Sequence, residues 1–498
     1  MDGTNVTQDT LALLKGALAK PDDALAKTIS TGTGLIAYDL QAPAKNLYPF
    51  YTPIRNVIPR VGGGTGTATN WRQVSAITGS GFDAMGWVPE GQRSAQMSYT
   101  TANKSASYVT IGEEDAATYE AISAGRGFED IQARMTFRLL QKMMQKEEMA
   151  ILGGNASLAL GTPTAPTLSA SGSGATLPAA TYSVIVVALT LEGYRNSSLA
   201  GGVATTMNIT GADGKSYTLS GGASNKSSNA TQAVTLGQTL FCSTPAIRGA
   251  VAYAWYVGTA GSETLQAITT INSAAFSAPL AGGTQAATAI TADNSRNPSY
   301  AFDGLLTTAL NSANNAYVNI LPTGTAGTGT PLTASGRGSV VEIDTMFQTM
   351  WDNFRLSPTV LYVNSQELKN ITNKVLSNAS GPLLRYEPAG GEEYRLTAAG
   401  VVEYYYNPFA PPDTGTKIPI RIHPFLPPGT IVGWAENLPI QYQSNEVPNV
   451  AEVKTRQDYY QIDWPIVTRQ RQVGVYAEEV LAVYAPFAMG VITNIANG

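Results

Sequence analysis

Histidine and cysteine are nearly absent from this 498-residue chain, which contains one of each, His423 and Cys242. A Ser/His/Asp triad, a Cys/His pair or a histidine-based metal site would therefore have to use His423. That residue lies between Ile422 and Pro424 at the end of a predicted strand, where we expect a structural role. A single cysteine excludes an intrachain disulfide and fits folding in a reducing cytoplasm. Cys242 follows Phe241 in a β-type segment and is predicted to be a small core residue.

Charged residues are also scarce, at 13% of the chain, which is about half of the usual share. The net charge is −5 and no basic tract stands out, so a protein that reads nucleic acid directly is not expected. Surfaces with so few charges are expected to contact other proteins. The N-terminal sequence MDGTNVTQDT has neither the basic region nor the apolar run of a signal peptide. No apolar stretch approaches the length of a membrane span, so we expect no membrane partner.

Sequence motifs for cofactors and catalysis are missing as well. There is no GxxxxGK(S/T) loop, and the run Gly62–Gly66 lacks the dinucleotide spacing and a following helix, so it is predicted to be a hinge. Adjacent acids occur at Glu147–Glu148, Glu392–Glu393 and Glu478–Glu479. Neighbouring side chains on a helix or strand point apart, so these acids are predicted to be solvated or interface charges. We expect no catalytic residue, no cofactor and no metal; a glycan hydrolase using two carboxylates is the remaining enzyme alternative.

What the chain does have is a long helix, predicted over residues 127–152 and followed by the stop signal Gly153-Gly154-Asn155. It would be roughly 39 Å long. Two apolar stripes recur at helical spacing: Phe128, Ile131, Met135, Leu139 and Met143 form one, and Phe137, Leu140, Met144 and Ile151 form the other. The polar residues share one narrow face that is predicted to be exposed: Asp130, Arg134, Arg138, Gln141, Gln145 and Glu148. Because two faces are apolar, the helix must be covered on two sides.

The segment before this helix begins with a predicted N-terminal arm, residues 1–60. Three prolines, Pro49, Pro53 and Pro59, predict an extended docking segment over residues 46–60. Its aromatic side chains need cover from another subunit or from another part of the same chain. They are Tyr48, Phe50 and Tyr51.

A long two-stranded loop is predicted over residues 61–112. Residues 70–77 and 95–111 show β-type alternation, with the turn Gly86-Trp-Val-Pro-Glu-Gly91 between them. An isolated hairpin of this length does not stabilise itself, so we expect it to lie on a partner. The turn region carries Trp87, Glu90 and Arg93, and we expect Glu90 to pair with a basic residue of a neighbouring subunit.

Residues 162–298 differ from the flanking chain because they hold few charges and several short strands separated by turns. The strands are predicted over residues 181–191, 250–258 and 263–271, with Trp255 as the core aromatic residue. This pattern predicts an immunoglobulin-like or fibronectin-like β-sandwich. Because helix-and-strand sequence flanks it on both sides, we interpret it as an insertion into an exposed loop.

The C-terminal part returns to mixed helix and strand. Helices are predicted over residues 340–355 and 365–376, with a buried strand at 358–363 between them and Ser365 as the N-cap of the second. Further strands are predicted over residues 401–406, 418–422 and 429–434, and residues 460–486 are β-rich. The whole chain is therefore predicted to be α+β with an inserted β-sandwich.

In this order, the segments resemble the major capsid proteins of tailed bacteriophages, which share the Hong Kong 97-type fold. The resemblance is carried by Gly86–Gly91 leading into 99–111, by Glu113-Glu114, and by 128–152, which match the extended loop and spine helix. Residues 340–376 resemble the axial domain and 474–495 the end of the peripheral domain. The resemblance implies the following division of the chain: an N-terminal arm (1–60), an extended loop (61–112), a peripheral domain (113–161, 299–339 and 456–498), an axial domain (340–455) and the insert (162–298).

The resemblance implies a subunit that forms hexamers and pentamers of an icosahedral shell around phage double-stranded DNA. Arm and loop would lie across neighbouring subunits, with interface candidates Tyr48, Phe50, Tyr51, Trp87, Glu90, Arg93, Arg134 and Arg138. Lys104 is the candidate for covalent crosslinking by its location. The implied partners are other copies, portal, scaffold and decoration proteins, and non-specifically packaged DNA on the inner face. The implied location is the virion, and the host cytoplasm during assembly.

Two other classes of protein remain open at this point. An encapsulin-like compartment would share the shell but store protein cargo. A surface adhesin or tail protein would use the immunoglobulin-like domain for binding, although the missing export signal and the long helix count against it.

Overall fold

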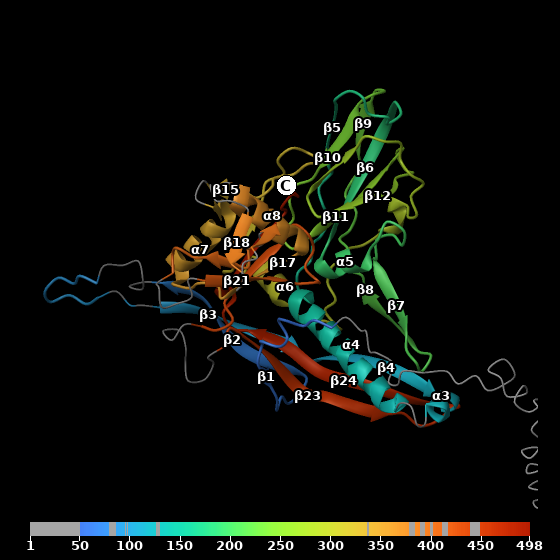
Figure 1. The fold of residues 1–498 in the computed structure, drawn as a ribbon, viewed down its shortest axis with the longest axis vertical. Helices are drawn as coiled ribbons and strands as arrows, with labels where there is room; N and C mark the ends of the chain where they lie inside the picture. Colours follow the sequence, from blue (N-terminus) through green and yellow to red (C-terminus); the bar gives the residue numbers. More distant parts are fainter. Residues whose placement is uncertain are drawn as a thin grey trace, which may run out of the picture.

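A computed structural model describes residues 50–78, 86–94, 96, 98–125, 130–335, 338–377, 384–388, 394–398, 402–410, 417–438 and 449–498. The fold is α+β, as predicted. Figure 1 shows a body of two sheets with helices, a hairpin that extends from it, and a tall two-sheet unit beside it. Residues 1–49, including Tyr48 and most of the predicted arm, lie outside the described residues.

The first sheet of the body has the strand order β1-β23-β24-β4. Its strands are β1 (Arg60–Val61), β23 (Ala451–Asp463), β24 (Gln470–Val483) and β4 (Val109–Thr118). The long helix α4 (Ile131–Gly153) lies along this sheet, next to the short helix α3 (Tyr119–Ala124) (Figure 1). Met135, Leu139 and Met143 of the first predicted stripe are buried against strand β24. This side of the helix is therefore covered as the periodicity predicted.

Both ends of α4 have local causes. Asp130 caps the N-terminus, because its Oδ1 accepts from the backbone N–H groups of Gln132 (3.0 Å) and Ala133 (3.2 Å). At the other end a Cβ on Gly154 would lie 2.6 Å from the carbonyl oxygen of Phe302, so only glycine permits the close approach of the next segment. The predicted stop is confirmed. The helix begins at Ile131, and the predicted start at residues 127–129 lies outside the described residues.

The second predicted stripe of α4 is only partly covered. Ile151 is fully buried, but Phe137 is 53% exposed. The prediction that both apolar faces are covered is therefore wrong for Phe137 within this subunit.

The hairpin consists of β2 (Ala68–Thr78) and β3 (Ser98–Ser107), paired antiparallel from Ala68↔Ser107 to Thr78↔Ser98. Among the described strands, each of the two pairs only with the other. The prediction of one strand over residues 95–111 is wrong, because the strand ends at Ser107 and resumes at Val109. The first part, β3, pairs with β2, and the second part, β4, pairs with β24. The chain therefore changes its pairing partner at Tyr108.

The second sheet of the body has the order β14-β25-β22-β17-β21-β20. Its strands are β14 (Tyr317–Ile320), β25 (Met489–Thr493), β22 (Ile431–Trp434), β17 (Val360–Val363), β21 (Lys417–Ile422) and β20 (Tyr404–Tyr406). Helices α7 (Val341–Phe354) and α8 (Ser365–Ser377) agree with the two predicted helices. The N-terminal hydrogen bond of α8 comes from Asn364, whose Oδ1 accepts from Gln366 N at 3.0 Å, and not from Ser365 as predicted.

Strand β25 belongs to this second sheet, between β14 and β22, although it was predicted with the final peripheral strands. Its parallel pairing with β14 is a contact across more than 160 residues of chain, which no local pattern indicates. The two faces of the sheet serve different cores. Leu361 and Val363 of β17 pack with α7, whereas Val360 and Tyr362 join the central core of the body.

The remaining elements of the body are short. They are α6 (Leu305–Leu310), β15 (Ala334–Ser335), β16 (Ser339–Val340), β18 (Leu384–Pro388), β19 (Tyr394–Ala398) and the 3-10 turn Pro486–Ala488.

The predicted insert folds as two facing sheets, β13-β10-β5 and β12-β11-β6-β9, with an extra hairpin β7-β8. The strands are β5 (Thr167–Ser171), β6 (Ala180–Leu189), β7 (Thr206–Thr210), β8 (Ser216–Ser220), β9 (Ala230–Val234), β10 (Thr239–Ser243), β11 (Ala252–Gly258), β12 (Thr264–Thr269) and β13 (Ser273–Phe276), with helix α5 (Leu191–Asn196) and the 3-10 turn Ala287–Ala289. Trp255 is fully buried between the sheets, and its indole N–H donates to Thr269 Oγ1 at 2.8 Å. Cys242 lies in the same core, and burial raises the pKa of its thiol to about 12.

This two-sheet unit is continuous with the body. Leu191 and Val251 belong to the same hydrophobic cluster as Ile151 of α4 and Phe302. The two connecting segments are also joined by hydrogen bonds, because Asp303 accepts from the backbone N–H groups of residues 156 (2.8 Å) and 157 (2.9 Å). The two-sheet unit is therefore packed against helix α4 and the central core of the body.

Candidate assembly surfaces and a buried carboxylate cluster

The predicted interface residues lie at three separate places. Phe50 and Tyr51 are exposed at the start of the segment that leads into β1. Trp87, Glu90 and Arg93 lie on the loop of the hairpin and are all exposed. Arg134 is half-buried and Arg138 exposed on helix α4, and Lys104 is half-buried on β3 opposite Trp71. The structure therefore does not bring these residues together within one subunit.

The hairpin loop presents its indole to solvent. A turn closes between Pro89 and Gln92, whose N–H donates to the Pro89 carbonyl at 3.1 Å, and Gly91 takes the positive φ of 76° that favours glycine. Trp87 is 87% exposed and Val88 beside it is also exposed. A large apolar side chain in this position loses the stabilisation of burial, roughly 1.5–3 kcal/mol. The loop is therefore suited to contact a partner.

A second exposed apolar loop was missed by the sequence analysis. It joins β23 to β24 and exposes Trp464, Ile466 and Val467, the last to 89%. It lies next to α3, because Arg469 forms an ion pair with Glu120 at 2.5 Å. The motif Trp-Pro-Ile-Val between two strands was a usable signal for such a loop, since proline ends pairing and no polar residue separates the apolar ones.

The segment around Pro53 does not extend as predicted. Residues 53–57 form a turn, with Ile58 N donating to the Ile54 carbonyl at 3.1 Å. Ile54 and Ile58 are buried in the central core of the body. Proline pre-sets φ for the first position of a turn, so Pro53 is compatible with this conformation. This part of the predicted arm finds its cover within its own subunit.

A buried carboxylate holds this turn in place. Glu148 of α4 is fully buried, and its oxygens accept from the backbone N–H groups of Ile54 (3.0 Å) and Arg55 (2.6 Å). His423 Nε2 lies 2.6 Å from the same carboxylate. Because the N–H of Phe425 donates to His423 Nδ1 at 3.2 Å, the hydrogen bond between His423 and Glu148 is donated by Nε2. The prediction that Glu148 lies on the exposed strip is wrong.

The neighbouring acid, Glu147, is buried as well and contacts both arginines of the segment. Arg55 Nε donates to Glu147 Oε2 at 2.6 Å, and Arg60 also bonds Glu147. Arg60 continues to Asp458 (2.6 Å) and to the buried Glu479 of β24 (3.1 Å). The prediction of solvated or interface charges is therefore wrong for Glu147 and Glu479, because both are buried and contact arginines that are distant in the sequence. Glu478, the neighbour of Glu479, points away and pairs with Arg456 at 2.5 Å.

The electrostatics of this cluster favour charged arginines. Burial alone would lower the pKa of Arg60, but the hydrogen bond to Asp458 and the charges of Glu147 and Glu479 raise it overall. Burial and the nearby charge of Glu147 raise the pKa of Tyr459, which donates to Glu147. Burial, followed by repulsion from Glu147, raises the pKa of Glu479 to about 8 in spite of Arg60. We define the carboxylate cluster as Glu147, Glu148, Glu479, Arg55, Arg60 and His423.

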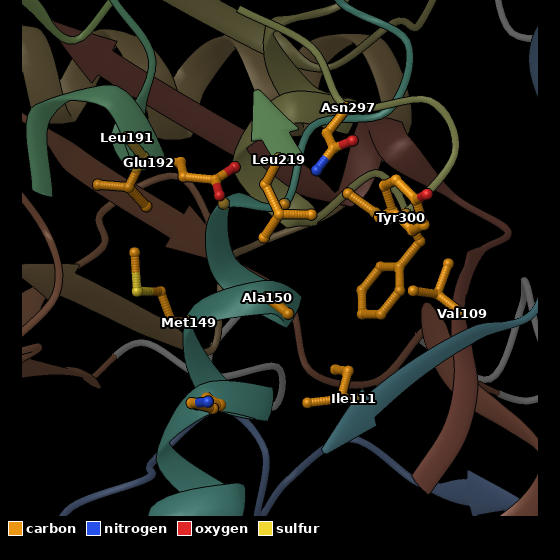
Figure 2. Close-up of a pocket in the computed structure, with 14 residues that line it drawn as sticks. Val109, Ile111, Met149, Ala150, Leu191, Glu192, Leu219, Asn297 and Tyr300 are labelled. Carbon is orange, nitrogen blue, oxygen red and sulfur yellow. The ribbon is translucent and has the colours of Figure 1, made fainter. Parts of the chain in front are cut away.

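An apolar cavity of about 190 Å³ lies where α4 meets the two-sheet unit (Figure 2). Ala150 of α4, Ile111 of β4 and Leu219 of β8 line it from three directions. Tyr300 lies on its border, and its ring is 6.4 Å from that of Tyr217 on β8. The β7-β8 hairpin therefore rests against the long helix, with incomplete packing between them.

Within the described ranges, no group of three or more His, Cys, Asp or Glu side chains is arranged to hold a metal ion. Helices long and apolar enough to cross a membrane are also absent from the described part of the chain.

No protein-family model and no curated protein matches the chain. Among solved structures, the capsid of a native GTA particle aligns with 96% of this chain and 100% of its own, at 8% identity and a TM-score of 0.42. A structure from Mycobacterium phage Bobi aligns with 93% and 98%, at 9% identity and a TM-score of 0.39. The SrpI encapsulin of Synechococcus elongatus PCC 7942 aligns with 96% and 96%, at 7% identity and a TM-score of 0.38. These alignments cover most of each chain, but the sequence identities and TM-scores are low.

Proposed function

We propose that the chain is the major subunit of an icosahedral capsid, which assembles through hexamers and pentamers and encloses phage double-stranded DNA. The main support is the hairpin β2-β3, whose strands pair only with each other among the described strands and whose loop exposes Trp87. A long two-stranded hairpin does not stabilise itself, and an exposed apolar loop is typical of a surface that contacts another molecule. The exposed loop between β23 and β24 offers a second contact.

The order of segments also supports the proposal. A core-anchored N-terminal turn, a long hairpin, a long helix on a sheet and a second mixed sheet follow each other as the sequence resemblance implied. We assign residues 1–60 to the arm, 61–112 to the extended loop, 340–455 to the axial domain and 113–161, 299–339 and 456–498 to the peripheral domain. Residues 162–298 are assigned as an immunoglobulin-like insert that projects from the shell. The role is structural, without catalysis.

The low charge fits this role. A chain with a net charge of −5 does not bind packaged DNA tightly, so contact with DNA on the inner face is non-specific. Portal, scaffold and decoration proteins are further partners of such a shell. The protein would reside in the virion, and in the host cytoplasm during assembly.

Shortening the hairpin tests this function. Val74 pairs with Thr101, so residues 75–100 can be removed and the two strands joined by an Asn-Gly turn. We expect the purified variant to keep the thermal unfolding of the body and to remain as monomers or small rings in negative-stain microscopy. The full chain is expected to form closed particles.

A matched control removes the same kind of element from another place. Residues 209–217 can be replaced by an Asn-Gly turn because Asn208 pairs with Thr218 in β7-β8. This variant is expected to assemble. Closed shells from the β2-β3 variant would refute the role of the hairpin. The full chain could also form closed particles that package protein cargo instead of nuclease-protected DNA during infection. That result would favour an encapsulin-like compartment.

A further inference from the structure

The cavity between helix α4 and the two-sheet unit is large enough for a small organic molecule. Its volume is about 190 Å³, and an apolar cavity of roughly 150 Å³ already holds a benzene molecule in a protein interior. Every residue that lines it lies within the described ranges 98–125 and 130–335. The cavity is not sealed, since Tyr300 on its border is 54% exposed. A small molecule therefore has both the space and an entry.

The walls of the cavity are mainly apolar and come from both the body and the two-sheet unit. The apolar side chains that form them include Ile111, Met149, Ala150, Leu191, Leu219 and Phe302. Ala150 and Gly153 share one face of α4, because residues three apart are neighbours on a helix. Their small size keeps this face of the helix away from the opposite wall. An apolar body that occupied the space would be removed from water on several sides.

Two polar groups border this apolar space without a partner among the described residues. The Asn297 side chain is only 7% exposed, and its amide forms no hydrogen bond to any of them. The half-buried Glu192 carboxylate has neither a hydrogen bond nor an ion pair there, and Lys146 on the cavity wall pairs with Glu113 instead. In Figure 2 both head groups lie toward one end of the cavity, away from Ile111. Buried amides are nearly always hydrogen-bonded, so this end of the cavity is suited to a polar ligand group.

Both polar groups are carried by backbone in a fixed position. Asn297 N donates to the Asn155 carbonyl at 2.7 Å. Glu192 lies in the first turn of α5, whose N-cap Thr190 accepts from Gly193 N at 3.1 Å. A ligand that meets polar groups on such a backbone has less ordering to bring about when it binds.

We propose that this cavity binds a small primary amine with a compact apolar body, of the size of benzylamine. The apolar body would lie beside Ala150 and Ile111, and the ammonium group would donate to the Glu192 carboxylate and to Asn297 Oδ1. Burial raises the pKa of Glu192, so the site disfavours an unpaired carboxylate and would be stabilised by a cation beside it. This site does not depend on the proposed shell function.

A ligand in this position would contact both parts of the subunit at once. Ile111 and Ala150 belong to the body, whereas Leu219 and Glu192 belong to the two-sheet unit. Binding is therefore expected to hold the β7-β8 hairpin more firmly on α4, which backbone hydrogen exchange can measure.

Binding of benzylamine to the full-length chain tests the proposal. In calorimetric titrations we expect one saturable site per subunit, with a Kd on the order of 0.1–1 mM for a ligand of so few atoms. Benzyl alcohol has nearly the same shape without the charge, and we expect it to bind about tenfold more weakly. Saturating benzylamine should also slow hydrogen exchange in β7 and β8.

Two variants separate the apolar part of the site from the polar part. Ala150→Leu occupies the cavity and should abolish binding of both compounds, with thermal unfolding showing that the chain stays folded. Glu192→Gln keeps the shape of the side chain, and it should weaken benzylamine by about tenfold and leave benzyl alcohol unchanged. The matched control is Asp213→Asn, which makes the same change of charge at an exposed acid of the β7-β8 turn. It should leave both affinities unchanged.

Three results would overturn the amine site. They are benzylamine binding that persists in A150L, equal weakening by E192Q and D213N, and the absence of saturable binding up to about 10 mM. In the last case, an ordered water molecule on Asn297 and Glu192 in a high-resolution structure would assign these groups to hydration alone. None of these results bears on shell assembly, which particle formation by the unmodified chain tests separately.

Discussion

Glu148 shows how one side chain fixes a distant segment. It accepts two backbone N–H groups from the turn at Ile54 and Arg55 and a third proton from His423, all in a site without solvent. Buried donors that lose their acceptor cost far more than the hydrogen bond itself contributes in water. The position of the N-terminal turn on α4 therefore depends on this carboxylate more than on the apolar contacts of Ile54.

The substitution Glu148→Gln tests this dependence. The amide keeps one acceptor oxygen but places an NH₂ group against a donor, so we expect the free energy of unfolding to fall by about 2–3 kcal/mol. The turn should also loosen, and limited trypsin digestion should cut after Arg55 and Arg60 faster than in the unmodified chain.

Glu113 provides a control on strand β4, next to the same helix. It pairs with the half-exposed Lys142 and Lys146, so Glu113→Gln is expected to cost less than about 1 kcal/mol and to leave the trypsin sites protected. Equal destabilisation by the two substitutions would contradict the special role of Glu148.

Glu479 predicts a pH dependence. Its pKa is raised from 4.5 to about 8 in the folded protein, first by burial and then by Glu147. Between these values the folded state binds more protons than the unfolded state, so the free energy of unfolding decreases as the pH rises from about 5 to about 8. Glu479→Gln mimics the protonated acid and should remove this part of the decrease. Denaturant titrations at pH 5, 6.5 and 8 measure it, and parallel pH slopes for the two proteins would exclude Glu479 as the cause.

At the scale of elements, the helices and strands with strong periodicity were predictable from the sequence. The buried stripe of α4, its stop at Gly154, and helices α7 and α8 follow from local patterns of apolar residues and caps. Pairing partners were not predictable, because they depend on contacts far along the chain. The break at Tyr108 and the place of β25 in the second sheet both result from such partners.

The candidate site was predictable only on its exposed side. Trp87, Glu90 and Arg93 lie on a Gly/Pro turn, which indicated that they are exposed, and their role as interface residues stays a prediction. The carboxylate cluster was not identified, since adjacent glutamates on a polar helix face normally contact water. Their arginine partners lie about ninety residues away in the chain, and nothing near Glu147 or Glu148 in the sequence indicates them.

The cavity between α4 and the β7-β8 hairpin leads to a stability prediction. Ala150 borders this space (Figure 2), and leucine at this position adds three carbon atoms that the cavity of about 190 Å³ can hold. We expect Ala150→Leu to raise the free energy of unfolding by about 1 kcal/mol. Ala133→Leu on the exposed side of the same helix should change it by less than about 0.5 kcal/mol. A lower stability of Ala150→Leu would show that the cavity does not persist in solution.

At the scale of the whole molecule, the two-sheet unit has a core of its own but also contributes residues to the central core of the body. Leu191 and Val251 pack in the same cluster as Ile151 and Phe302, and Arg248 Nε donates to the Leu310 carbonyl at 2.6 Å. Units joined by a shared core unfold together, whereas units joined by a linker unfold separately. The predicted insert is therefore expected to behave as part of the body.

Calorimetry of the isolated subunit tests this unity. We expect one cooperative transition, and Val251→Ala should shift the whole transition because it removes roughly 2 kcal/mol from the shared core. Val257→Ala, within the separate core between the two sheets, provides the comparison. Two transitions, with only one of them shifted by Val251→Ala, would show that the two-sheet unit is an independent domain.

The two-stranded hairpin also affects the subunit before any partner arrives. Each strand of β2-β3 has one neighbour among the described strands, so both long margins of the ribbon carry backbone amides and carbonyls available to any passing strand. Such margins recruit further chains indiscriminately. We therefore expect newly made subunits to aggregate through these strands when no partner covers them, and slow expression at low temperature should reduce the aggregation.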